Sequence, residues 1–310
     1  MSRIVAIVNP QSEAGKTAKA WPDILARLEA RIGPLESRLT QARGHATALA
    51  REALAQGADW LICVGGDGTL NEVINGMFEN DQPLNPEAQL SLIMRGTGGD
   101  FRKSLGLENT LEAYLEALAT APVRQIDLGK VTLKNEATQE FSRYFVNLGS
   151  FGMGGDVVHR IENTPWLKQM GGTPGFMLAS LQSLSQFKPQ RVRLQIDETL
   201  DWQIKILQVA VANGTTHGGG MRVAPLAELN DGWFDLVILT GIGPFEAALT
   251  FPRVYQGTHL SAPAVRHLRC RQLVAEALGK EPVWIEIDGE TPGKLPAHFE
   301  LLPGLLRLKG

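Results

Sequence analysis

A glycine-rich string with one central carboxylate is the feature of this sequence that most directly suggests chemistry. Residues 65–69 read Gly-Gly-Asp-Gly-Thr, and Leu70, Asn71 and Glu72 follow. The string comes directly after residues 60–63, an apolar run typical of a buried strand, and a helix-like pattern follows it. Glycines at a strand-to-helix junction let a ligand approach the backbone closely, and the free N–H groups of a helix start favour an anion. This junction is therefore a candidate phosphate site.

The carboxylate of Asp67 narrows the chemistry at this junction. Because a carboxylate repels a phosphate, we expect Asp67 to bind Mg²⁺ or to orient a hydroxyl group or a ribose. The string is not a Walker loop, since no Gly-Lys-Ser/Thr follows it. The alternative is an ordinary turn in which Asp67 caps the helix.

Further turns are expected at the same edge of the sheet. Asn9 follows the first predicted strand, and Thr97 and Asp100 lie in the glycine-rich turn 95–100. Thr97 could donate its hydroxyl group to a phosphate or a base, and Thr40, after the second predicted strand, is a further candidate of this kind. Simple turn chemistry and helix capping are the alternatives. Ligands bind at the carboxyl ends of parallel strands, so the convergence of these turns favours nucleotide binding.

An acidic turn in the second half of the chain could hold a cation. Asn230-Asp231-Gly232 is strong turn chemistry before a predicted strand. Asp231 could also bind a hard cation there, with the backbone carbonyls of Glu228 and Trp233 as further oxygen ligands.

A second acidic segment, Asp288-Gly289-Glu290, follows the strand predicted at 283–287. Residues two apart on an extended chain face the same way, so the two carboxylates could share a site. One would act as a general base while the other positions metal or water. The alternative is a solvated hairpin turn.

The elements that must position these residues form two patterns. Strands are predicted at 3–8, 35–40, 60–64 and 90–94, and helices at 17–31, 45–56, 70–77 and 110–119. Such alternation predicts a mostly parallel sheet. After Pro122 the pattern predicts strands at 123–132, 141–148, 191–196, 203–212, 234–239, 283–287 and 299–302, with helical stretches only at 176–187 and 244–251. Strands separated by glycine-rich turns favour an antiparallel arrangement.

We therefore predict an α/β fold with two domains. A parallel-sheet, nucleotide-binding domain spans residues 1–122, and a β-rich, sandwich-like domain spans residues 123–310. An apolar stripe in the second domain is either core, which such stripes usually are, or a face for a membrane or an acyl chain. Its members are Phe176, Met177, Leu178, Leu181 and Leu184.

Composition excludes several classes of protein. The 310 residues are 44% hydrophobic and 20% charged, with a net charge of −3, so nothing suggests a nucleic-acid-binding protein. No apolar run is long enough to span a bilayer, and no leader-like segment is seen at the start. The two cysteines, Cys63 and Cys270, cannot form a disulfide framework or a zinc site. A cytoplasmic location without stable membrane insertion is the expectation.

Taken together, these motifs resemble those of the diacylglycerol kinase catalytic-domain family, and within it the bacterial YegS-type and DgkB-type lipid kinases. The resemblance extends almost from end to end of the chain, through Asn9-Pro10, Ser12, Gly15-Lys16, Thr40, Gly44-His45-Ala46, residues 65–69, Asn71-Glu72, Gly96-Thr97, Asp100-Phe101, Asn213-Gly214 and residues 218–220, 225–232, 288–290 and 302–304. The glycine-aspartate string is shared with NAD kinases and phosphofructokinases, whereas the C-terminal motifs are specific to the lipid-kinase branch.

The resemblance implies a two-domain kinase that binds ATP in the cleft between the domains, with the last residues returning to the first domain. It implies ATP contacts at Asn9, Thr40, Gly65, Gly66, Asp67, Gly68, Thr69, Leu70, Asn71, Glu72 and Thr97. It implies a Mg²⁺ site at the carbonyls of Glu228 and Trp233 and the side chain of Asp231. Glu290 would be the general base that deprotonates the lipid hydroxyl group, and Mg²⁺ near Asp67 would offset the phosphate charge.

Two departures from the family pattern are present. Relatives usually carry Pro-Leu-Gly-Thr-x-Asn-Asp-Phe, whereas residues 94–101 here read Met-Arg-Gly-Thr-Gly-Gly-Asp-Phe. Gly99 thus removes an amide that could serve the nucleotide, while Arg95 adds a cation that could compensate. In the N-terminal motif, Glu13-Ala14 precedes Gly15 and interrupts the usual pattern.

The sequence therefore predicts an ATP- and Mg²⁺-dependent kinase for a lipid hydroxyl group, for example that of diacylglycerol or phosphatidylglycerol. Contact with the lipid surface should be transient, since no polybasic cluster or lipidation motif is present. The alternatives are an NAD kinase-like small-molecule kinase and a nucleotide-binding regulator without turnover. The lipid, the physiological metal and the oligomeric state, a homodimer included, stay open.

Overall fold

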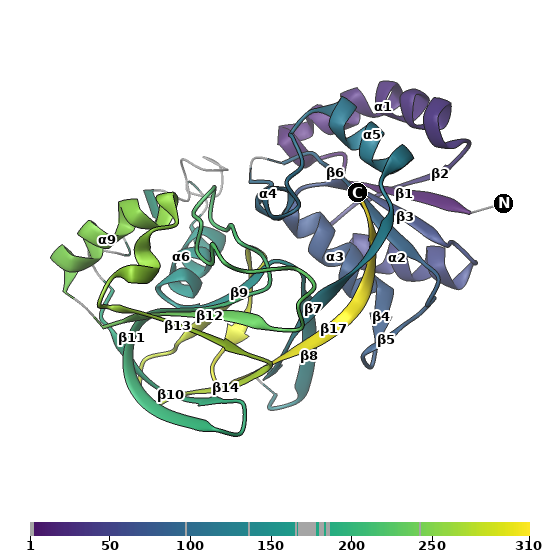
Figure 1. Cartoon of the computed structure of the whole chain (residues 1–310). Coiled ribbons are helices and arrows are strands. Elements are labelled where there is room, and N and C mark those ends of the chain that lie inside the picture. The colour runs from purple at the N-terminus through teal and green to yellow at the C-terminus, as the bar shows by residue number, and fades with distance from the viewer. Residues whose placement is uncertain are drawn as a thin grey trace. The chain divides into compact units, whose positions relative to one another are not determined.

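The computed structural model describes residues 3–96, 98–135, 137–164, 166, 178, 179, 183, 187–241 and 243–310. Thr97 and four members of the apolar stripe, Phe176, Met177, Leu181 and Leu184, lie outside the described residues. The chain divides into two units (Figure 1), the first made of Met1–Asp127 and Gly304–Gly310 and the second of Leu128–Pro303. Two strands, β7 (Val123–Lys134) and β17 (Ala297–Lys309), run across this division.

The first unit contains the predicted parallel sheet. Its strands β1 (Ile4–Val8), β2 (Glu36–Leu39), β3 (Trp60–Gly65) and β6 (Gln89–Met94) pair in the order β6-β3-β1-β2, all parallel. The end of β17 adds to β6, where Leu308 pairs with Leu90 in parallel. Every residue of β1 and β3 is buried, which explains their uninterrupted apolar runs.

Helices cover both faces of this sheet (Figure 1), with α1 (Lys16–Ile32) and α5 (Leu111–Thr120) on one face. The other face carries α2 (His45–Ala55) and α3 (Asp67–Met77). The short pieces are η1 (Ser12–Gly15), α4 (Asp100–Ser104) and the small hairpin of β4 (Phe78–Glu79) and β5 (Gln82–Pro83). The alternating pattern of strands and helices is thus confirmed.

The second unit is β-rich, and the registers determined for its strands are antiparallel. Its further strands are β8 (Glu140–Phe145), β9 (Leu148–Gly152), β10 (Gln190–Ile196), β11 (Leu200–Ala212), β12 (Phe234–Thr240), β13 (Val265–Cys270), β14 (Gln272–Ala277), β15 (Trp284–Ile287) and β16 (Glu290–Lys294). They pair in the order β16-β15-β9-β11-β10-β14-β17, with β12 joining β11 to β13 and β8 lying beside β7.

An aromatic core holds the second unit together. The rings of Phe145 and Phe234 stack with their centroids 5.7 Å apart, and those of Phe151 and Phe299 stack at 5.9 Å. These rings come from β8, β12, β9 and β17, so strands distant in the sequence share one core. The predicted β-rich, sandwich-like second half is confirmed.

The helical content of this unit differs from the prediction. The helix predicted at 244–251 is confirmed as α9 (Pro244–Gln256), but α6 (Met153–Asn163) was not predicted, since the pattern gave helical stretches only at 176–187 and 244–251. A Cβ on Gly155 would lie 2.0 Å from the carbonyl oxygen of Trp284, so this glycine lets α6 lie directly against β15. Leu178, the described member of the stripe, packs on the core beside Met153 of α6.

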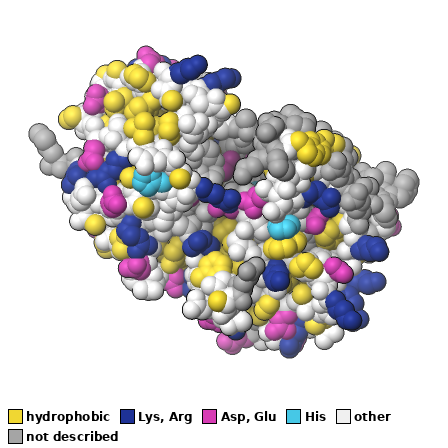
Figure 2. All heavy atoms as spheres, turned by 180° about the vertical axis from the view of Figure 1, so that it is seen from behind, with side chains coloured by type: hydrophobic (Ala, Val, Ile, Leu, Met, Phe, Trp, Pro, Cys, Tyr) yellow, Lys and Arg dark blue, Asp and Glu magenta, His cyan; other side chains and the backbone are white. Residues whose placement is uncertain are grey.

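One predicted strand, 141–148, is wrong because the chain forms two strands there, β8 and β9. Among the described residues, no helix combines the length and apolar character needed to cross a membrane. On the face shown in Figure 2, Lys and Arg side chains lie among Asp and Glu side chains, in keeping with the small net charge of −3.

Candidate functional site

The junction between β3 and α3 lies at the carboxyl edge of the parallel sheet. Since β1, β2 and β3 are parallel, Asn9, Thr40 and Gly65, which follow or end these strands, come to this one edge. The amide group of Asn9 donates to the hydroxyl oxygen of Thr69 over 3.0 Å and so ties the end of β1 to the first turn of α3. The edge thus gathers the described members of the predicted nucleotide set from separate parts of the chain.

Asp67 belongs to the helix and not to the turn before it. The predicted helix start at Leu70 is wrong, because α3 begins at Asp67 with Gly66 as its N-cap residue. This places the carboxylate in the first turn, where the helix dipole stabilises negative charge. One carboxylate oxygen accepts the backbone N–H of Gly99 over 2.8 Å. Asp67 therefore links the two glycine-rich segments.

The glycines of these segments allow the two turns to touch. A Cβ on Gly96 would lie 2.8 Å from the Cα of Gly66, and a Cβ on Gly65 would lie 2.6 Å from the hydroxyl oxygen of Thr69. Gly99 has a φ of +59°, a conformation that glycine and asparagine adopt most readily. The sequence departure at position 99 thus preserves a residue type that fits the backbone.

The side chains that follow Asp67 mostly build the junction. Thr69, Leu70 and Asn71 are buried. The carboxylate of Glu72 accepts the backbone N–H groups of Gly44, over 2.7 Å, and Ala46, over 3.1 Å, at the start of α2. Glu72 therefore holds the neighbouring helix start in place, and its nucleotide contact stays a prediction.

The two departures from the family pattern contact each other. The guanidinium group of Arg95 forms an ion pair of 2.7 Å with Glu13, and both side chains are partly buried. Glu13 and Ala14 both have positive φ angles, 52° and 56°, which is a strained conformation for residues other than glycine. Arg95 is thus neutralised by Glu13 instead of standing as an isolated cation.

The predicted cation turn is held by an arginine. The carboxylate of Asp231 accepts the backbone N–H of Trp233 over 3.0 Å and forms an ion pair with Arg269. The guanidinium groups of Arg269 and Arg271 lie 5.5 and 4.5 Å from the centre of the Trp233 ring. Glu228 is exposed. In the described part of the chain, no group of three or more His, Cys, Asp or Glu side chains is arranged to hold a metal ion.

The oxygen atoms predicted to bind Mg²⁺ nevertheless fit a hard cation in kind. One carboxylate and two carbonyl groups would leave the remaining coordination positions to water or phosphate, which is usual for Mg²⁺. A cation bound to Asp231 would compete with Arg269 for the carboxylate.

Asp288 and Glu290 do not lie on one extended strand, so the prediction that their carboxylates face the same way is wrong. Asp288 and Gly289 have φ angles of +46° and +91°, and Ile287 pairs with Glu290 across them. This is the two-residue hairpin turn that Asp-Gly favours.

The carboxylate of Asp288 is a structural group. The backbone N–H groups of Val146, Asn147 and Leu148 donate to it over 2.9, 3.1 and 3.0 Å, and only 6% of the residue is exposed. These three bonds give the carboxylate a structural role, and its part in positioning metal or water stays a prediction. The carboxylate also divides β8 from β9, because these three amides turn toward it instead of continuing one strand.

Glu286 is a buried acid that the sequence pattern did not reveal. Alternation along β15 predicts a solvent-facing side chain, but α6 covers that face and the residue is 0% exposed. Its carboxylate accepts the hydroxyl group of Ser150 over 2.9 Å and the backbone N–H of Gly289 over 2.6 Å, and lies 3.2 Å from Nε2 of His217. Burial raises the pKa of Glu286, and the charge of His217 opposes this rise.

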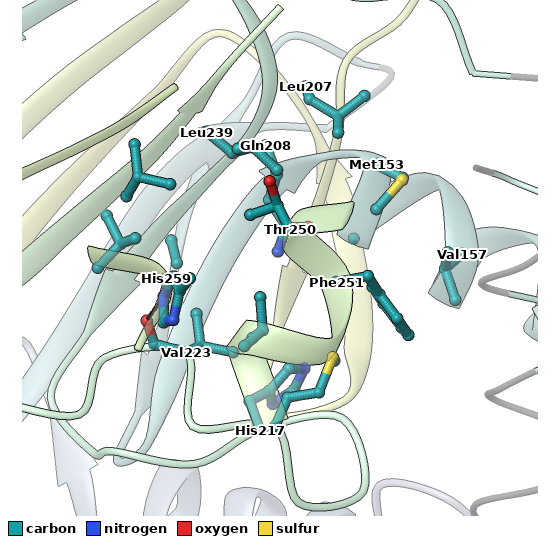
Figure 3. A pocket seen from close by; sticks show the side chains of 16 residues that line it. Met153, Val157, Leu207, Gln208, His217, Val223, Leu239, Thr250, Phe251 and His259 are labelled. Atoms are coloured by element: carbon teal, nitrogen blue, oxygen red, sulfur yellow. Dashed lines mark hydrogen bonds between the residues drawn. The ribbon is translucent and has the colours of Figure 1, made fainter. Parts of the chain in front are cut away.

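His217, whose Nε2 lies 3.2 Å from this carboxylate, also lines an apolar pocket in the second unit (Figure 3). Its described lining comes from α6, β11, β12, β13, α9 and the loop of residues 217–223, with Met153, Leu207, Leu239 and Phe251 among the apolar side chains. His217 is one of the few polar side chains on its wall. The sequence could not reveal this pocket, because its walls come from segments far apart in the chain.

A second histidine of the pocket lining, His259, links its own turn to the segment that contains Val223. His259 is buried, and its Nε2 lies 2.9 Å from the carbonyl oxygen of Val223. Burial lowers the pKa of His259, so the neutral ring is favoured.

Two protein-family models match the chain. The diacylglycerol kinase catalytic domain matches residues 3–131, and the YegS C-terminal NAD kinase beta sandwich-like domain matches residues 148–310. Together they cover nearly the whole sequence.

Similar proteins carry names consistent with these two matches. The diacylglycerol kinase of Staphylococcus saprophyticus is 30% identical over 294 residues, which are 94% of this chain and 90% of that protein. The diacylglycerol kinase of Bacillus subtilis is 29% identical over 301 residues, which are 96% and 93% of the two chains. A crystal structure of a diacylglycerol kinase from Bacillus anthracis has the same fold, with a TM-score of 0.71, 20% identity and coverage of 99% of this chain and 96% of that one.

Proposed function

Because the chain belongs to the diacylglycerol kinase family, in its YegS- and DgkB-like bacterial branch, we propose that it uses ATP and Mg²⁺ to phosphorylate a hydroxyl group of a lipid such as diacylglycerol or phosphatidylglycerol. The enzyme is a kinase of the lipid-kinase class, as its family and relatives indicate. The nucleotide, the metal and the identity of the lipid are the proposed parts.

The observation that carries the proposal is the β3–α3 junction. Gly65 and Gly96 let the two glycine-rich turns pack closely there, and the start of α3 offers N–H groups suited to phosphate oxygens. Asn9 and Thr69 are already joined there, so a nucleotide would meet a preorganised surface. Thr40 stays a predicted contact at the same edge.

The apolar pocket supports a lipid as the phosphate acceptor. Pockets for small ligands are lined mainly by apolar side chains with a few placed polar groups. The pocket of the second unit has this composition, with His217 and Gln208 among mostly aliphatic neighbours. A sugar or a dinucleotide would leave its hydroxyl groups without partners against such a wall.

Glu290 is the proposed general base. Phosphoryl transfer depends on positioning and on neutralising phosphate charge more than on covalent help from the protein. Glu290 begins β16 directly after a rigid turn, so its backbone position is fixed on both sides by paired residues. A carboxylate held in this way could accept the proton of the lipid hydroxyl group as the phosphate arrives.

Mg²⁺ would supply charge neutralisation for the phosphates of ATP. The oxygen atoms proposed to hold it are the carboxylate of Asp231 and the carbonyls of Glu228 and Trp233, with Asp67 at the helix start near the phosphates.

We also propose that the protein binds the lipid surface, such as the inner face of a membrane, only transiently. A homodimer is a further proposal.

The test is phosphate transfer from labelled ATP to a panel of lipids presented in mixed micelles. We expect a labelled phospholipid from the wild type with Mg²⁺, and none after Mg²⁺ is chelated. A protein that is stabilised by ATP on heating but forms no product would indicate a regulator without turnover. Product from NAD⁺ and none from any lipid would refute the proposal.

A further inference from the structure

The turn that carries Glu290 is held by buried acids on two sides. Asp288 accepts the three backbone amides of residues 146–148. Glu286 accepts the amide of Gly289, the residue directly before Glu290, over 2.6 Å. The position of the proposed base thus depends on two buried carboxylates that hold the turn before it.

The cost of burying Glu286 points to a role beyond stability. The residue is 0% exposed and its neighbours on β15 are isoleucines, so an apolar side chain could fill the same space. A buried acid seldom stabilises a fold more than a well-packed apolar side chain does, because the acid loses its hydration. Glu286 is satisfied on both oxygen atoms, by Ser150 on one and by Gly289 and His217 on the other.

His217 connects this carboxylate to the pocket. Its Nε2 lies 3.2 Å from Glu286, and its side chain forms part of the pocket wall (Figure 3). The backbone of His217 exchanges two hydrogen bonds with Met221, which also lines the pocket, across three glycines with positive φ. A molecule in the pocket therefore lies against a loop whose histidine is bonded to Glu286.

We propose that Glu286 is a positioning residue that joins the pocket wall, through His217, to the turn that carries Glu290. This inference rests on the proposed function, since it gives Glu290 its orientation toward a lipid. A lipid in the pocket would contact His217 and fix its side chain against Glu286. The Glu286 carboxylate would then hold the Gly289 amide, and with it Glu290 at the start of β16, in the position needed for the reaction.

The test compares Glu286→Ala with Glu286→Gln in the full chain. Glu286→Ala removes the acceptor of the Gly289 amide. We expect kcat for lipid phosphorylation to fall by about 10- to 100-fold, because small displacements of reacting groups slow a reaction by factors of this size. The KM for ATP should stay unchanged, because the junction in the first unit keeps all of its contacts. Glu286→Gln keeps an oxygen atom for Gly289 and should retain most of kcat.

A second readout does not depend on activity. Hydrogen exchange of the peptide that contains Gly289 should be slow in the wild type and become faster in Glu286→Ala. Addition of dioctanoylglycerol micelles should slow this exchange further in the wild type but not in His217→Phe, which keeps the ring volume and loses the bond to Glu286.

The matched control is Leu194→Ala on β10. This residue is fully buried, so the change should lower the Tm of the second unit, but β10 does not pair with β15 or β16. We expect kcat of the folded protein to match the wild type.

The possible failures can be told apart. A wild type that phosphorylates no lipid would overturn the proposed function. A wild type that is active, with Glu290→Ala inactive but Glu286→Ala as active as the wild type, would overturn the positioning role alone. Unchanged exchange at Gly289 in Glu286→Ala would overturn it as well.

Discussion

Removal of the Asp288 carboxylate should destabilise the second unit far more than removal of another aspartate from a hairpin turn. Asp288→Ala leaves the amides of Val146, Asn147 and Leu148 buried without their acceptor. At the lower end of about 1 kcal/mol for each orphaned amide, the free energy of unfolding falls by about 3 kcal/mol. For a unit of this size that corresponds to a drop in Tm of roughly 6–12 °C.

Asp288→Asn separates the charge from the backbone conformation. Asparagine tolerates the φ of +46° at this position, and its carbonyl oxygen can keep the amides of Asn147 and Leu148, which share one oxygen of Asp288. Its NH₂ group would face the amide of Val146, so we expect about half the loss of stability seen in Asp288→Ala.

The control is Asp197→Ala, at the turn between β10 and β11. Asp197 has a φ of +47° and accepts the amides of Arg271 and Gln272, each over 2.9 Å, but at an exposed site. In Asp197→Ala, water can accept these two amides in place of the carboxylate, so the free energy of unfolding should fall by less than about 1 kcal/mol. Urea and thermal unfolding, followed by circular dichroism, measure all three variants. If Asp288→Ala melts within about 2 °C of the wild type, or if Asp197→Ala loses as much, the account of this turn is wrong.

Three further predictions concern other parts of the chain. Because the pKa of His259 is lowered in the folded protein, the histidine of the unfolded chain binds a proton first as the pH falls. The stability that the neutral ring contributes is therefore complete above the ordinary pKa of 6.5 and is lost as the pH falls below it. Urea unfolding from pH 8 to 5 should show a steeper decline in the free energy of unfolding for the wild type than for His259→Leu. Gly155→Ala should destabilise by about 1–3 kcal/mol because its Cβ would meet the carbonyl group of Trp284, whereas Gly279→Ala, which meets nothing, should change the melting temperature little; equal melting temperatures would contradict this. Cys63 and Cys270 are fully buried and burial raises the pKa of both thiols, that of Cys270 to about 12, so neither should react with a thiol reagent at pH 8 until urea unfolds the chain, and rapid labelling of the native protein would be the contrary result.

The first unit could be predicted almost element by element, because its strands and helices differ in hydrophobic period. The fully buried apolar runs predict strands at β1 and β3, and the helical spacing of buried residues predicts a helix at α1. The start of α3 was misplaced because Asp67 and Gly68 are poor helix formers, yet the free amides of the helix start favour a carboxylate there.

The second unit was harder to predict because tertiary contacts decide its local structure. Glycines in a sequence signal turns, but Gly155 is required by the close approach of α6 to β15. Asp288 looks like an exposed turn residue until three amides from residues 146–148 are placed around it. Glu286 alternates with isoleucines as a surface residue would, and only the packing of α6 shows that it is buried.

The candidate site was predicted as a set of separate motifs, and the structure places each described motif within its own unit. The nucleotide set gathers at one sheet edge because parallel strands end together there. The partners that fix these residues, among them Glu13 for Arg95 and Gly99 for Asp67, have no signal in the sequence.

The most direct measurement is the rate of phosphate transfer from ATP to a lipid by Glu290→Gln and by the wild type, with ATP binding measured in parallel. We expect a phospholipid product from the wild type and a loss of about 10²- to 10⁴-fold in kcat for Glu290→Gln, with ATP bound equally well by both proteins. A Glu290→Gln variant that transfers phosphate at the wild-type rate would contradict this expectation.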